Sequence, residues 1–423
     1  TAYLEVALTE PDFLSKNLNQ TKPEVIEQFR LNVHKMVLGR PIKSRVEARA
    51  MVLAVATAAQ KQIGLNPTVT IHEYVAGAVG LLDPYSGYMT PGELSEVLSQ
   101  IEGNLIGLGV ELWAEKDDLR IVEVFDGSPA SAAGLRTGDR ILQVGNVLTA
   151  EVSAKRAADL LRGPENSDVK LLIARGEQSP NEVVVTRRRV EVPSVSAVEM
   201  IDVDSRVGYI RITNFQKTTI AEVDQALWKL NRSGMKSLII DLRRNPGGLL
   251  DAAVEVADRF LTQGAIVTTR GRNGNENRNY LAREPQTWDV PLVVLIDKDS
   301  ASASEIFAGA IRDHRRGTLV GSTSYGKGSV QGLFHTDTAA GGLRLTVSKF
   351  FSPLGHPIAL RGVDPDIRVE TVTSNKVGFD AVVAAKGTDG SHLVDFKNHD
   401  QDAALKAALD AARNSVKVSA RPR

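Results

Sequence analysis

Cysteine is absent from all 423 residues of the chain. Its absence excludes a disulfide framework, a cysteine nucleophile and a metal site with cysteine ligands. An excess of charge is also missing, because 51 basic side chains balance 51 acidic ones, so no global field favours nucleic acid or an anionic membrane. No apolar run reaches the roughly 18 residues of a membrane-spanning helix. The remaining composition, 42% hydrophobic and 24% charged, is typical of a globular protein with two or three domains.

The stretch from 291 to 331 carries most of the chemistry. The apolar run 292–296 follows a proline and predicts a buried strand. Small residues come next, followed by apolar ones at three- and four-residue steps, and they predict a helix that begins near Ser302. A turn from strand to helix exposes a side chain and directs backbone N–H groups at whatever binds there. The turn is therefore suited to a nucleophile.

Two interpretations of Ser302 stay open on these residues alone. Ser302 and Glu305 fit Ser-x-x-Glu, an ordinary capping box. A serine nucleophile instead needs a base, and the nearby candidates are His314, His335 and Lys327. A lysine acts as a base only where its surroundings lower its pKa from about 10.4 towards about 7–8. Otherwise Lys327 is a solvated charge in a glycine loop.

A nucleotide site is the competing interpretation of the loop around Lys327. Gly321, Gly326 and Lys327 fit the G-x-x-x-x-G-K pattern of a phosphate-binding loop. That motif continues with Ser or Thr, which holds magnesium, and with a helix. Gly328 stands there instead, and 329–334 has no helical pattern. The sequence therefore disfavours nucleotide binding.

The order of motifs in this stretch resembles the active-site signature of the carboxyl-terminal processing proteases, also called tail-specific proteases, the Ser/Lys peptidase family S41. The spacings from Ser302 to Lys327 and from Lys327 to Gln331 match that family. The matching motifs are Ser300-Ala301-Ser302-Ala303-Ser304-Glu305 and Tyr325-Gly326-Lys327-Gly328-Ser329-Val330-Gln331. The resemblance implies Ser302 as nucleophile, Lys327 as general base, and Gln331 as the residue that orients Lys327.

A pair of glycines is the candidate source of oxyanion donors. Gly247 and Gly248 follow a predicted strand, 237–242, and precede a predicted helix. Backbone N–H groups in such a turn can hold a developing oxyanion, an effect worth about 3–4 kcal/mol per donor in well-studied enzymes, although a plain β–α turn has the same pattern. The family's Asn-x-Gly-Gly stretch supplies one donor, and the residue after the serine supplies the other. The resemblance therefore implies Gly248, with Gly247 as the close alternative, and Ala303.

Residues 103–192 resemble a PDZ domain. The resemblance lies in an ordered set of motifs at 127–135 and 138–142, followed by a predicted helix at 152–161. A PDZ module holds the terminal carboxylate of a peptide with backbone N–H groups of a glycine-containing turn, and the peptide adds as a strand to the sheet edge. The implied peptide-binding residues are Ile106, Gly107, Leu108, Gly109 and Val110.

The predicted fold is a multidomain one, with an α/β catalytic core of ClpP/crotonase type, an inserted β-rich PDZ domain and an N-terminal helical segment. Strands that alternate with helices from 207 to 330 indicate a parallel core. Residues 190–203 are expected to connect the PDZ domain to that core. The expected domains are a helical region at 1–100, the PDZ domain at 103–192, the catalytic domain at 193–372 together with part of 70–100, and a tail at 373–423 with a terminal helix at 400–413.

The expected function is that of a serine endopeptidase of the carboxyl-terminal processing type. It would capture apolar C-terminal tails of protein substrates with its PDZ domain and cleave them through an acyl-enzyme. The alternative is a catalytically silent PDZ-containing scaffold or binding protein on the same fold. A crotonase-like acyl-CoA enzyme has no use for an inserted PDZ domain, and no G-x-S-x-G elbow surrounds Ser302.

The resemblance also sets expectations about partners and location. We expect protein or peptide C-termini as substrates, and no nucleic acid, metal or organic cofactor. A homo-oligomer and an adaptor protein both stay open. The family implies a periplasmic, cell-envelope or other extracytoplasmic compartment. Because the chain starts at Thr1 rather than Met, an upstream signal peptide or membrane anchor is also an open expectation.

Overall fold

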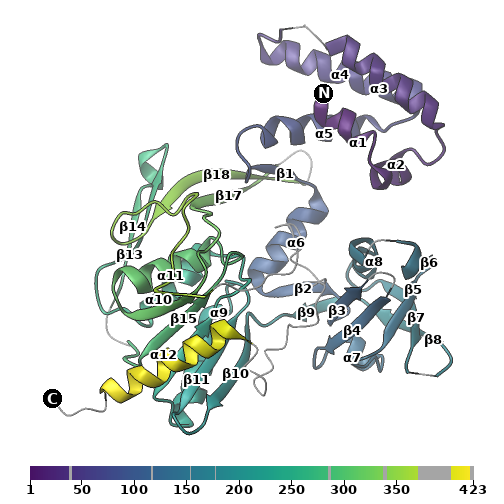
Figure 1. Ribbon diagram of the computed structural model, residues 1–423. Helices are drawn as coiled ribbons and strands as arrows, with labels where there is room; N and C mark the ends of the chain where they lie inside the picture. The colour runs from purple at the N-terminus through teal and green to yellow at the C-terminus, as the bar shows by residue number, and fades with distance from the viewer. Residues whose placement is uncertain are drawn as a thin grey trace. The chain divides into compact units, whose positions relative to one another are not determined.

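The computed structural model describes residues 1–37, 41–115, 118–152, 154–176, 178–283, 287–336, 341–369 and 402–419. The chain forms two compact units (Figure 1). The first holds Thr1–Ser95 and Gln331–Val347, and the second holds Glu96–Val330 and Ser348–Arg423. Within the described ranges, no helix combines the length and the apolar character that crossing a membrane requires.

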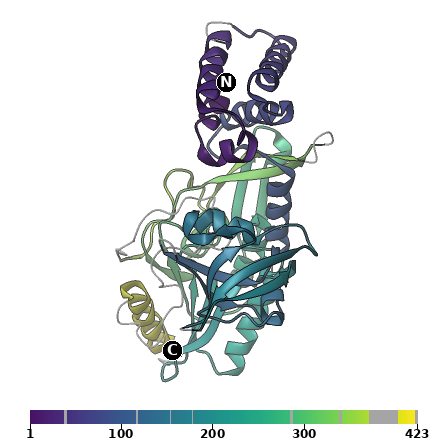
Figure 2. The same ribbon diagram turned by 90° about the vertical axis from the view of Figure 1, so that its right-hand side faces the viewer.

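The first unit is built mainly from helices, which pack as a bundle (Figures 1 and 2). Its buried core includes Phe29, Val33 and Val55. The longest helix begins at Ser44, whose hydroxyl accepts the N–H of Glu47, a regular N-cap. The helices are α1 (Ala2–Ala7), α2 (Pro11–Asn17), α3 (Pro23–Val37), α4 (Arg45–Ile63) and α5 (Pro67–Gly80).

Strands complete the first unit. The short strand β1 (Gly87–Met89) pairs antiparallel with the beginning of β18 (Gly342–Phe351). Strand β17 (Ser329–His335) also pairs with β18. Helix α6 (Pro91–Glu102) follows β1 and leads into the second unit.

The second unit is organised on a six-stranded sheet with the order β10-β11-β12-β15-β16-β19. Strand β10 runs antiparallel to β11, and every other neighbouring pair is parallel. The predicted strands at 237–242 and 292–296 are the neighbours β12 and β15. The strands are β10 (Val195–Asp202), β11 (Val207–Ile212), β12 (Ser237–Asp241), β15 (Leu292–Ile296), β16 (Gly317–Gly321) and β19 (Ile367–Arg368).

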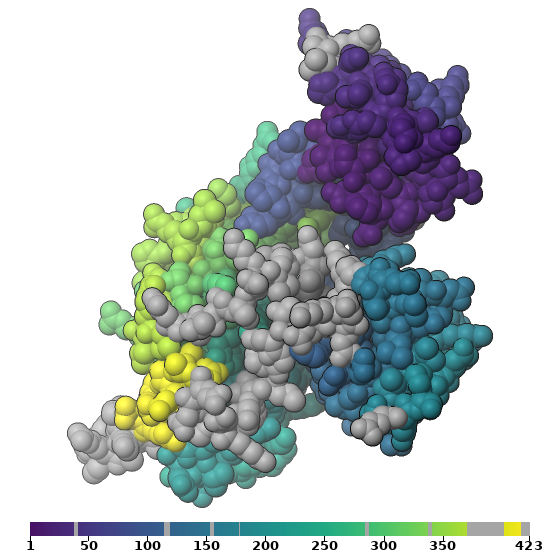
Figure 3. All heavy atoms as spheres, turned by 45° about the vertical axis from the view of Figure 1, so that its right-hand side comes forward, coloured from purple at the N-terminus to yellow at the C-terminus, as the bar shows by residue number. Residues whose placement is uncertain are grey.

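Helices cover both faces of this sheet. Alternate side chains of a strand point to opposite faces, so a buried strand contributes apolar side chains to two cores. In β12, Leu238 and Ile240 belong to the core on one face, and Ile239 belongs to the core on the other. The first face packs against three helices, and the second packs against α12 (Figure 1), which lies at the surface (Figure 3). The helices are α9 (Thr219–Arg232), α10 (Leu250–Asp258), α11 (Ala303–Asp313) and α12 (Ala403–Ser419).

Two expectations about connections change. Residues 190–203, expected as a link between domains, contain the end of β9 (Arg188–Glu191) and the whole of β10. They are ordered as strand because the backbone of β10 pairs along β11, from Val195 opposite Ile212 onward. The helix expected at 400–413 is α12, and the rest of the predicted tail, 373–401 and 420–423, lies outside the described residues.

A separate antiparallel sheet has the order β3-β4-β5-β7-β8 and a core of its own that includes Ile121, Ile141 and Leu171. Strand β3 lies at the edge of this sheet and contacts α8. Strand β2 (Asn104–Gly107) pairs with β9 outside the sheet. The elements are β3 (Val110–Glu115), β4 (Asp118–Val124), α7 (Pro129–Ala132), β5 (Arg140–Val144), β6 (Val147–Leu148), α8 (Ala154–Leu161), β7 (Asp168–Ala174) and β8 (Asn181–Thr186).

A hairpin completes the second unit. Strands β13 (Ala265–Gly271) and β14 (Arg278–Leu281) pair antiparallel. Strand β13 also pairs with the end of β18, where Thr268 lies opposite Phe351.

Candidate active site

Three turns follow neighbouring strands at one edge of the core sheet. Strands β12, β15 and β16 are parallel neighbours, so the segments that follow them begin at the same edge. In open α/β sheets, ligands bind outside this edge, at the carboxyl ends of the strands. The middle turn carries Ser302, and the flanking turns carry Gly248 and Lys327. The topology therefore gathers residues that are far apart in the chain.

Ser302 has an unusual backbone conformation. It caps α11 with φ 56° and ψ −112°, in a positive-φ region that residues other than glycine rarely adopt. Its neighbours Ala301 and Ala303 are fully buried, whereas Ser302 is partly exposed. Such backbone strain costs of order 1–3 kcal/mol and persists only where the surrounding structure imposes it. The packed turn thus presents one hydroxyl-bearing residue at the edge of the sheet.

The Glu305 carboxylate joins the Ser302 turn to the Lys327 loop. Its Oε2 atom accepts the N–H of Ser302 at 2.8 Å and the N–H of Lys327 at 2.9 Å. Its Oε1 atom accepts the hydroxyl of Ser324 at 2.6 Å and the N–H of Gly326 at 2.7 Å. Four donors match the acceptor capacity of one carboxylate. The shared oxygen places the main chains of Ser302 and Lys327 side by side.

Glu305 is fully buried. Burial raises the pKa of its carboxyl group, and the four hydrogen bonds act in the opposite direction without cancelling that effect. The Ser302–Glu305 capping box that the sequence predicts is present. Because the same carboxylate also holds the Lys327 loop, the capping and nucleophile interpretations of Ser302 do not exclude each other.

Asn245 ties the turn after β12 to the turn after β15. Its buried side chain donates to the carbonyl of Ile212 at 2.9 Å and accepts the N–H of Gly247 at 2.8 Å. Its main-chain carbonyl accepts the N–H of Ala301 at 3.0 Å and the hydroxyl of Ser304 at 3.0 Å. One residue therefore fixes both the glycine turn and the backbone on either side of Ser302.

A second pair of buried polar side chains joins the same two turns. Asp297 accepts the N–H of Arg244 at 2.9 Å, and the Ser300 hydroxyl donates to the carbonyl of Leu242 at 2.8 Å. Burial raises the pKa of Asp297, and the hydrogen bond from Arg244 only partly offsets this rise. These bonds leave the relative position of the two turns little freedom.

Two backbone N–H groups of these turns, those of Gly248 and Ala303, have no acceptor among the residues that the structure describes. The N–H of Gly247, by contrast, is bonded to Asn245. A Cβ atom at Gly247 would lie 2.7 Å from the Cβ of Ser302 and 2.9 Å from the nitrogen of Ala303. Only glycine fits this approach, which brings the glycine turn against the nucleophile turn.

The Lys327 loop packs closely on its own surroundings. A Cβ atom at Gly328 would lie 2.2 Å from the nitrogen of Ala359, so glycine is required there. Lys327 itself is partly buried. The chain continues from Gly328 as strand β17 and not as a helix. This excludes the phosphate-binding-loop interpretation, which needs a helix N-terminus at that point.

Gln331, in β17, belongs to the first unit. Its Nε2 atom donates to the Thr346 hydroxyl in a long hydrogen bond of 3.4 Å. That hydroxyl in turn donates to the Asp83 carboxylate at 3.0 Å. The role that the family resemblance gives Gln331, the orientation of Lys327, stays a prediction.

The two histidines considered as bases have other surroundings. His314 ends α11, the helix whose first end is capped by Ser302, and its Nε2 lies 2.7 Å from the carbonyl oxygen of Ala265. His335 is exposed at the end of β17. In the described ranges, no group of three or more His, Cys, Asp or Glu side chains is arranged to hold a metal ion.

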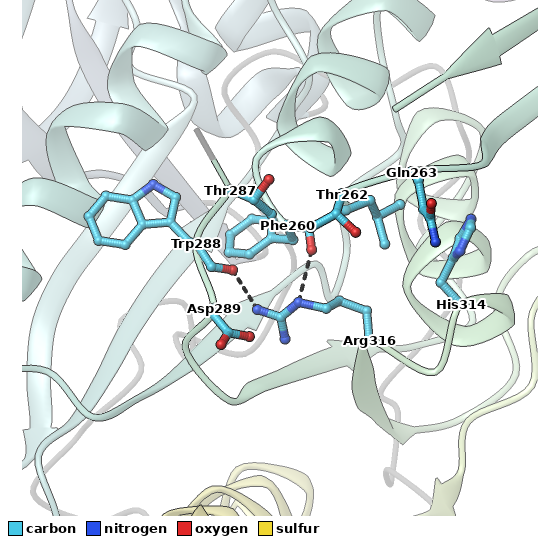
Figure 4. Close-up of a pocket in the computed structure, with 9 residues that line it drawn as sticks. Phe260, Thr262, Gln263, Thr287, Trp288, Asp289, His314 and Arg316 are labelled. Atoms are coloured by element: carbon cyan, nitrogen blue, oxygen red, sulfur yellow. Dashed lines mark hydrogen bonds between the residues drawn. The ribbon is translucent and has the colours of Figure 1, made fainter. Parts of the chain in front are cut away.

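A pocket of about 750 Å³ lies at the carboxyl ends of α10 and α11, away from the Ser302 end of α11 (Figure 4). Arg316 crosses it and donates to the carbonyls of Phe260 and Trp288 at 2.9 and 2.7 Å, as Figure 4 shows. Burial lowers the pKa of Arg316. The guanidinium joins two loops here, and we assign this pocket no catalytic role.

The predicted peptide-binding residues of the PDZ domain run from the end of β2 to the start of the edge strand β3. The N–H groups of Leu108 and Gly109 have no acceptor within the described part of the chain. Gly109 has a positive φ of 76°. Ile106 and Gly107 end β2, and Val110 begins the edge strand β3. The arrangement offers two N–H donors beside an unpaired strand edge.

Sequence reasoning missed Asn245 and Asp297, and it gave Glu305 only a capping role. A signal for Asp297 was available, because it directly follows a buried apolar strand, where active-site residues of parallel sheets gather. Asn245 lies just beyond another such strand.

Comparisons with known proteins identify the family of the chain. The model of peptidase family S41 matches residues 206–369, and a PDZ-domain model matches residues 120–175. The carboxy-terminal-processing protease of Bartonella bacilliformis is 36% identical over 320 residues, which cover 74% of this chain and 73% of the relative. The carboxyl-terminal-processing protease of Synechocystis is 38% identical over 295 residues, 68% of each chain.

Among solved structures, the photosystem II D1 C-terminal processing protease aligns with 88% of this chain and 94% of its own, at 24% identity and a TM-score of 0.45. The assignment rests on the curated relatives and the family model. This chain belongs to peptidase family S41, as a serine protease of the carboxyl-terminal-processing group that carries a PDZ domain.

Proposed function

We propose that this protein is an endopeptidase that cleaves protein substrates with a Ser302/Lys327 dyad. The Ser302 Oγ atom bonds to the carbonyl carbon of the scissile peptide, while neutral Lys327 Nζ takes the hydroxyl proton. The tetrahedral intermediate collapses, the C–N bond breaks, and Lys327 returns the proton to the leaving amine. Water then attacks the acyl-enzyme and restores Ser302, again with Lys327 as the base. Gln331 orients Lys327 in this proposal.

The proposed oxyanion hole consists of the N–H groups of Gly248 and Ala303. Both donors have no acceptor in the described residues. Ala303 directly follows Ser302, and Gly248 directly follows Gly247, which lies against the Ser302 turn. Gly247 is the weaker candidate because Asn245 already accepts its N–H. Donors that are fixed before the reaction stabilise developing charge without reorganisation, which is worth about 3–4 kcal/mol each in well-studied enzymes. Their arrangement supports a core of the ClpP/crotonase type.

The PDZ domain is proposed to capture the apolar C-terminus of the substrate. The N–H groups of Leu108 and Gly109 would bind its carboxylate, and the tail would add as a strand to the open edge of β3. A substrate with a C-terminal amide tests this step. We expect the amide to raise KM about tenfold relative to the free carboxylate, because one charge-assisted interaction is lost. Equal KM values for the two substrates would rule out carboxylate capture.

The single observation that carries the dyad is the shared Glu305 oxygen, which binds the N–H of Ser302 and the N–H of Lys327. The experiment is cleavage of an unfolded, apolar-tailed protein by wild type, Ser302→Ala and Lys327→Ala. We expect each variant to lose about a thousandfold or more in kcat. The matched controls are Ser322→Ala, in the neighbouring loop, and Lys349→Ala, which is exposed.

The outcomes separate the enzyme from the silent scaffold. Cleavage by wild type and the controls, with none by the two dyad variants, supports the protease. Binding of tailed peptides without any cleavage by wild type would favour the scaffold instead. Full activity in either dyad variant would contradict the assignment of Ser302 and Lys327 as the catalytic pair. The extracytoplasmic location, the substrate and an adaptor or second copy as partner stay predictions.

A further inference from the structure

A short chain of polar contacts leads from Gln331 to a turn at residues 83–86. The Nε2 atom of Gln331 donates to the hydroxyl of Thr346 at 3.4 Å. The Thr346 hydroxyl donates to Oδ1 of Asp83 at 3.0 Å. All three residues belong to the first unit, although Asp83 and Thr346 are far apart in the chain. Nothing in the proposed mechanism uses Asp83 or Thr346.

The Asp83 carboxylate has several donors and a defined direction of hydrogen bonding. Its Oδ1 accepts the N–H groups of Tyr85 and Ser86 at 2.8 and 3.0 Å, and its Oδ2 accepts the Ser86 hydroxyl at 2.6 Å. Burial raises the pKa of Asp83, but the hydrogen bonds from Ser86, Tyr85 and Thr346 outweigh it and hold the pKa below its usual value. Asp83 is therefore ionised at neutral pH, and an ionised carboxylate only accepts hydrogen bonds.

The direction of the hydrogen bond from Thr346 to Asp83 also determines how the amide of Gln331 is oriented. A hydroxyl has one proton, so when Thr346 gives it to Asp83, its oxygen can only accept from Gln331. The partner on Gln331 must then be the NH₂ group. The amide is planar, so this places Oε1 on the opposite side, where it acts as an acceptor. An acceptor is what the amine of a lysine base requires, because an NH₂ group there would oppose its protonated form.

Several contacts hold Thr346 and its strand beside the turn that contains Asp83. The N–H of Thr346 donates to the hydroxyl oxygen of Ser86 at 3.1 Å. Two residues earlier, Arg344 donates to the carbonyl of Tyr85 at 3.0 Å, and its backbone pairs with Gly87 of β1. The turn that contains Asp83 is thus attached to β18 at several points. Ordered backbone therefore holds both ends of the series of contacts from Asp83 through Thr346 to Gln331, which we call the relay.

We propose that Asp83 and Thr346 are positioning residues, which set the amide of Gln331 so that Oε1 accepts from Lys327. The inference rests on the proposed function, because it takes Lys327 as the base and Gln331 as its orienting partner. In this proposal Asp83 and Thr346 take no direct part in the chemical step. Their effect on the reaction passes entirely through the direction of one side-chain amide.

The test substitutes Thr346 and Asp83 in the intact chain. Thr346→Val removes the hydroxyl and keeps the volume, and Thr346→Ser keeps the hydroxyl. We expect Thr346→Val to lower kcat at least tenfold with KM within twofold of wild type, and Thr346→Ser to retain at least half of kcat. Thr336→Val is the matched control, because it also removes a hydroxyl bond in the same unit, to the carbonyl of Gly341, and it should leave kcat unchanged.

Asp83→Ala supplies an independent variant. It removes the carboxylate that accepts the Thr346 hydroxyl, so this hydroxyl can point at Gln331 and no longer fixes the direction of the amide. We expect a loss in kcat similar to that of Thr346→Val, and no further loss in the double variant, because both changes act through one path. Losses that multiply in the double variant, or wild-type kcat in folded Thr346→Val or folded Asp83→Ala, would overturn the inference.

Ser302→Ala is assayed in parallel to separate the two proposals. Activity in Ser302→Ala would remove the proposed function and this inference with it. An inactive Ser302→Ala beside a fully active Thr346→Val would overturn the relay alone. Thermal unfolding of each variant identifies a misfolded protein, and where Thr346→Val is misfolded the Asp83→Ala result decides.

Discussion

Glu305→Gln tests most sharply whether the Glu305 carboxylate holds the Ser302 turn and the Lys327 loop together. The change keeps the shape of the side chain and replaces one carboxylate oxygen by an NH₂ group. In wild type each oxygen accepts two donors, so the NH₂ group must face a pair of donors whichever way the amide turns. Facing Ser302 and Lys327, it leaves two N–H groups without an acceptor. Facing Ser324 and Gly326, it leaves one, because the Ser324 hydroxyl can reverse.

The magnitude follows from the better of these orientations. One buried N–H without an acceptor costs about 1–3 kcal/mol, and the remaining bonds lose the charge assistance of a carboxylate, about 1 kcal/mol in total. Removal of a fully buried charge offsets part of this cost, as the raised pKa of Glu305 indicates. We therefore expect a net loss of about 2–3 kcal/mol in the free energy of unfolding.

The expected effect on activity is larger than the effect on folding alone. In the better orientation the N–H of Gly326, directly before Lys327, loses its acceptor, so the Lys327 loop can shift relative to Ser302. A displacement of about 1 Å between them costs on the order of a hundredfold in rate. The assay measures kcat on an unfolded, apolar-tailed protein, together with the urea midpoint. Glu255→Gln, an exposed change on α10, is the control and should shift stability by less than about 0.5 kcal/mol. Wild-type kcat in Glu305→Gln would refute the reasoning.

Three further outcomes follow. Arg243→Leu should cost about 3–5 kcal/mol in the urea-unfolding free energy, because it leaves the buried carboxylate of Asp241 without its cation; a loss below 1 kcal/mol would contradict this. Gly248→Ala should abolish cleavage, since φ is 134° and the new Cβ would lie 2.1 Å from the carbonyl oxygen of Phe215; an active variant would contradict the assignment. Burial raises the pKa of Glu305 above its ordinary value of 4.5, so its contribution to stability is complete below that value and is lost as the pH rises through the folded pKa. The stability difference between wild type and Glu305→Gln should therefore fall as the pH rises from 4.5, and a rise would show the opposite shift.

Local patterns in the sequence predicted the elements that carry the site. The strand at 292–296 and the helix that starts after Ser302 follow from the apolar run and the helical spacing, and both are present as β15 and α11. The spacing from Ser302 to Lys327 matched the family resemblance, and the structure adds that both residues lie in segments that follow the neighbouring strands β15 and β16. What local pattern cannot supply is which strands become neighbours, and hence which turns meet.

The contacts that hold the site together depend on that missing information. Glu305 fits a capping box on local sequence, but its second pair of donors comes from a loop after another strand. The partners Asp83 and Thr346 are separated by 263 residues in the chain. Arg243, beside the glycine turn, pairs with Asp402 at the start of α12. Such long-range pairs follow from the tertiary fold and have no periodic signature in the sequence.

Intact-protein and peptide mass spectrometry of the enzyme, acid-quenched during turnover of an apolar-tailed substrate, tests the dyad most directly. The expected result is an acyl adduct on the peptide that contains Ser302 in wild type, and no adduct in Ser302→Ala or Lys327→Ala. An adduct on a different residue, or cleavage by Ser302→Ala at the wild-type rate, would contradict the account.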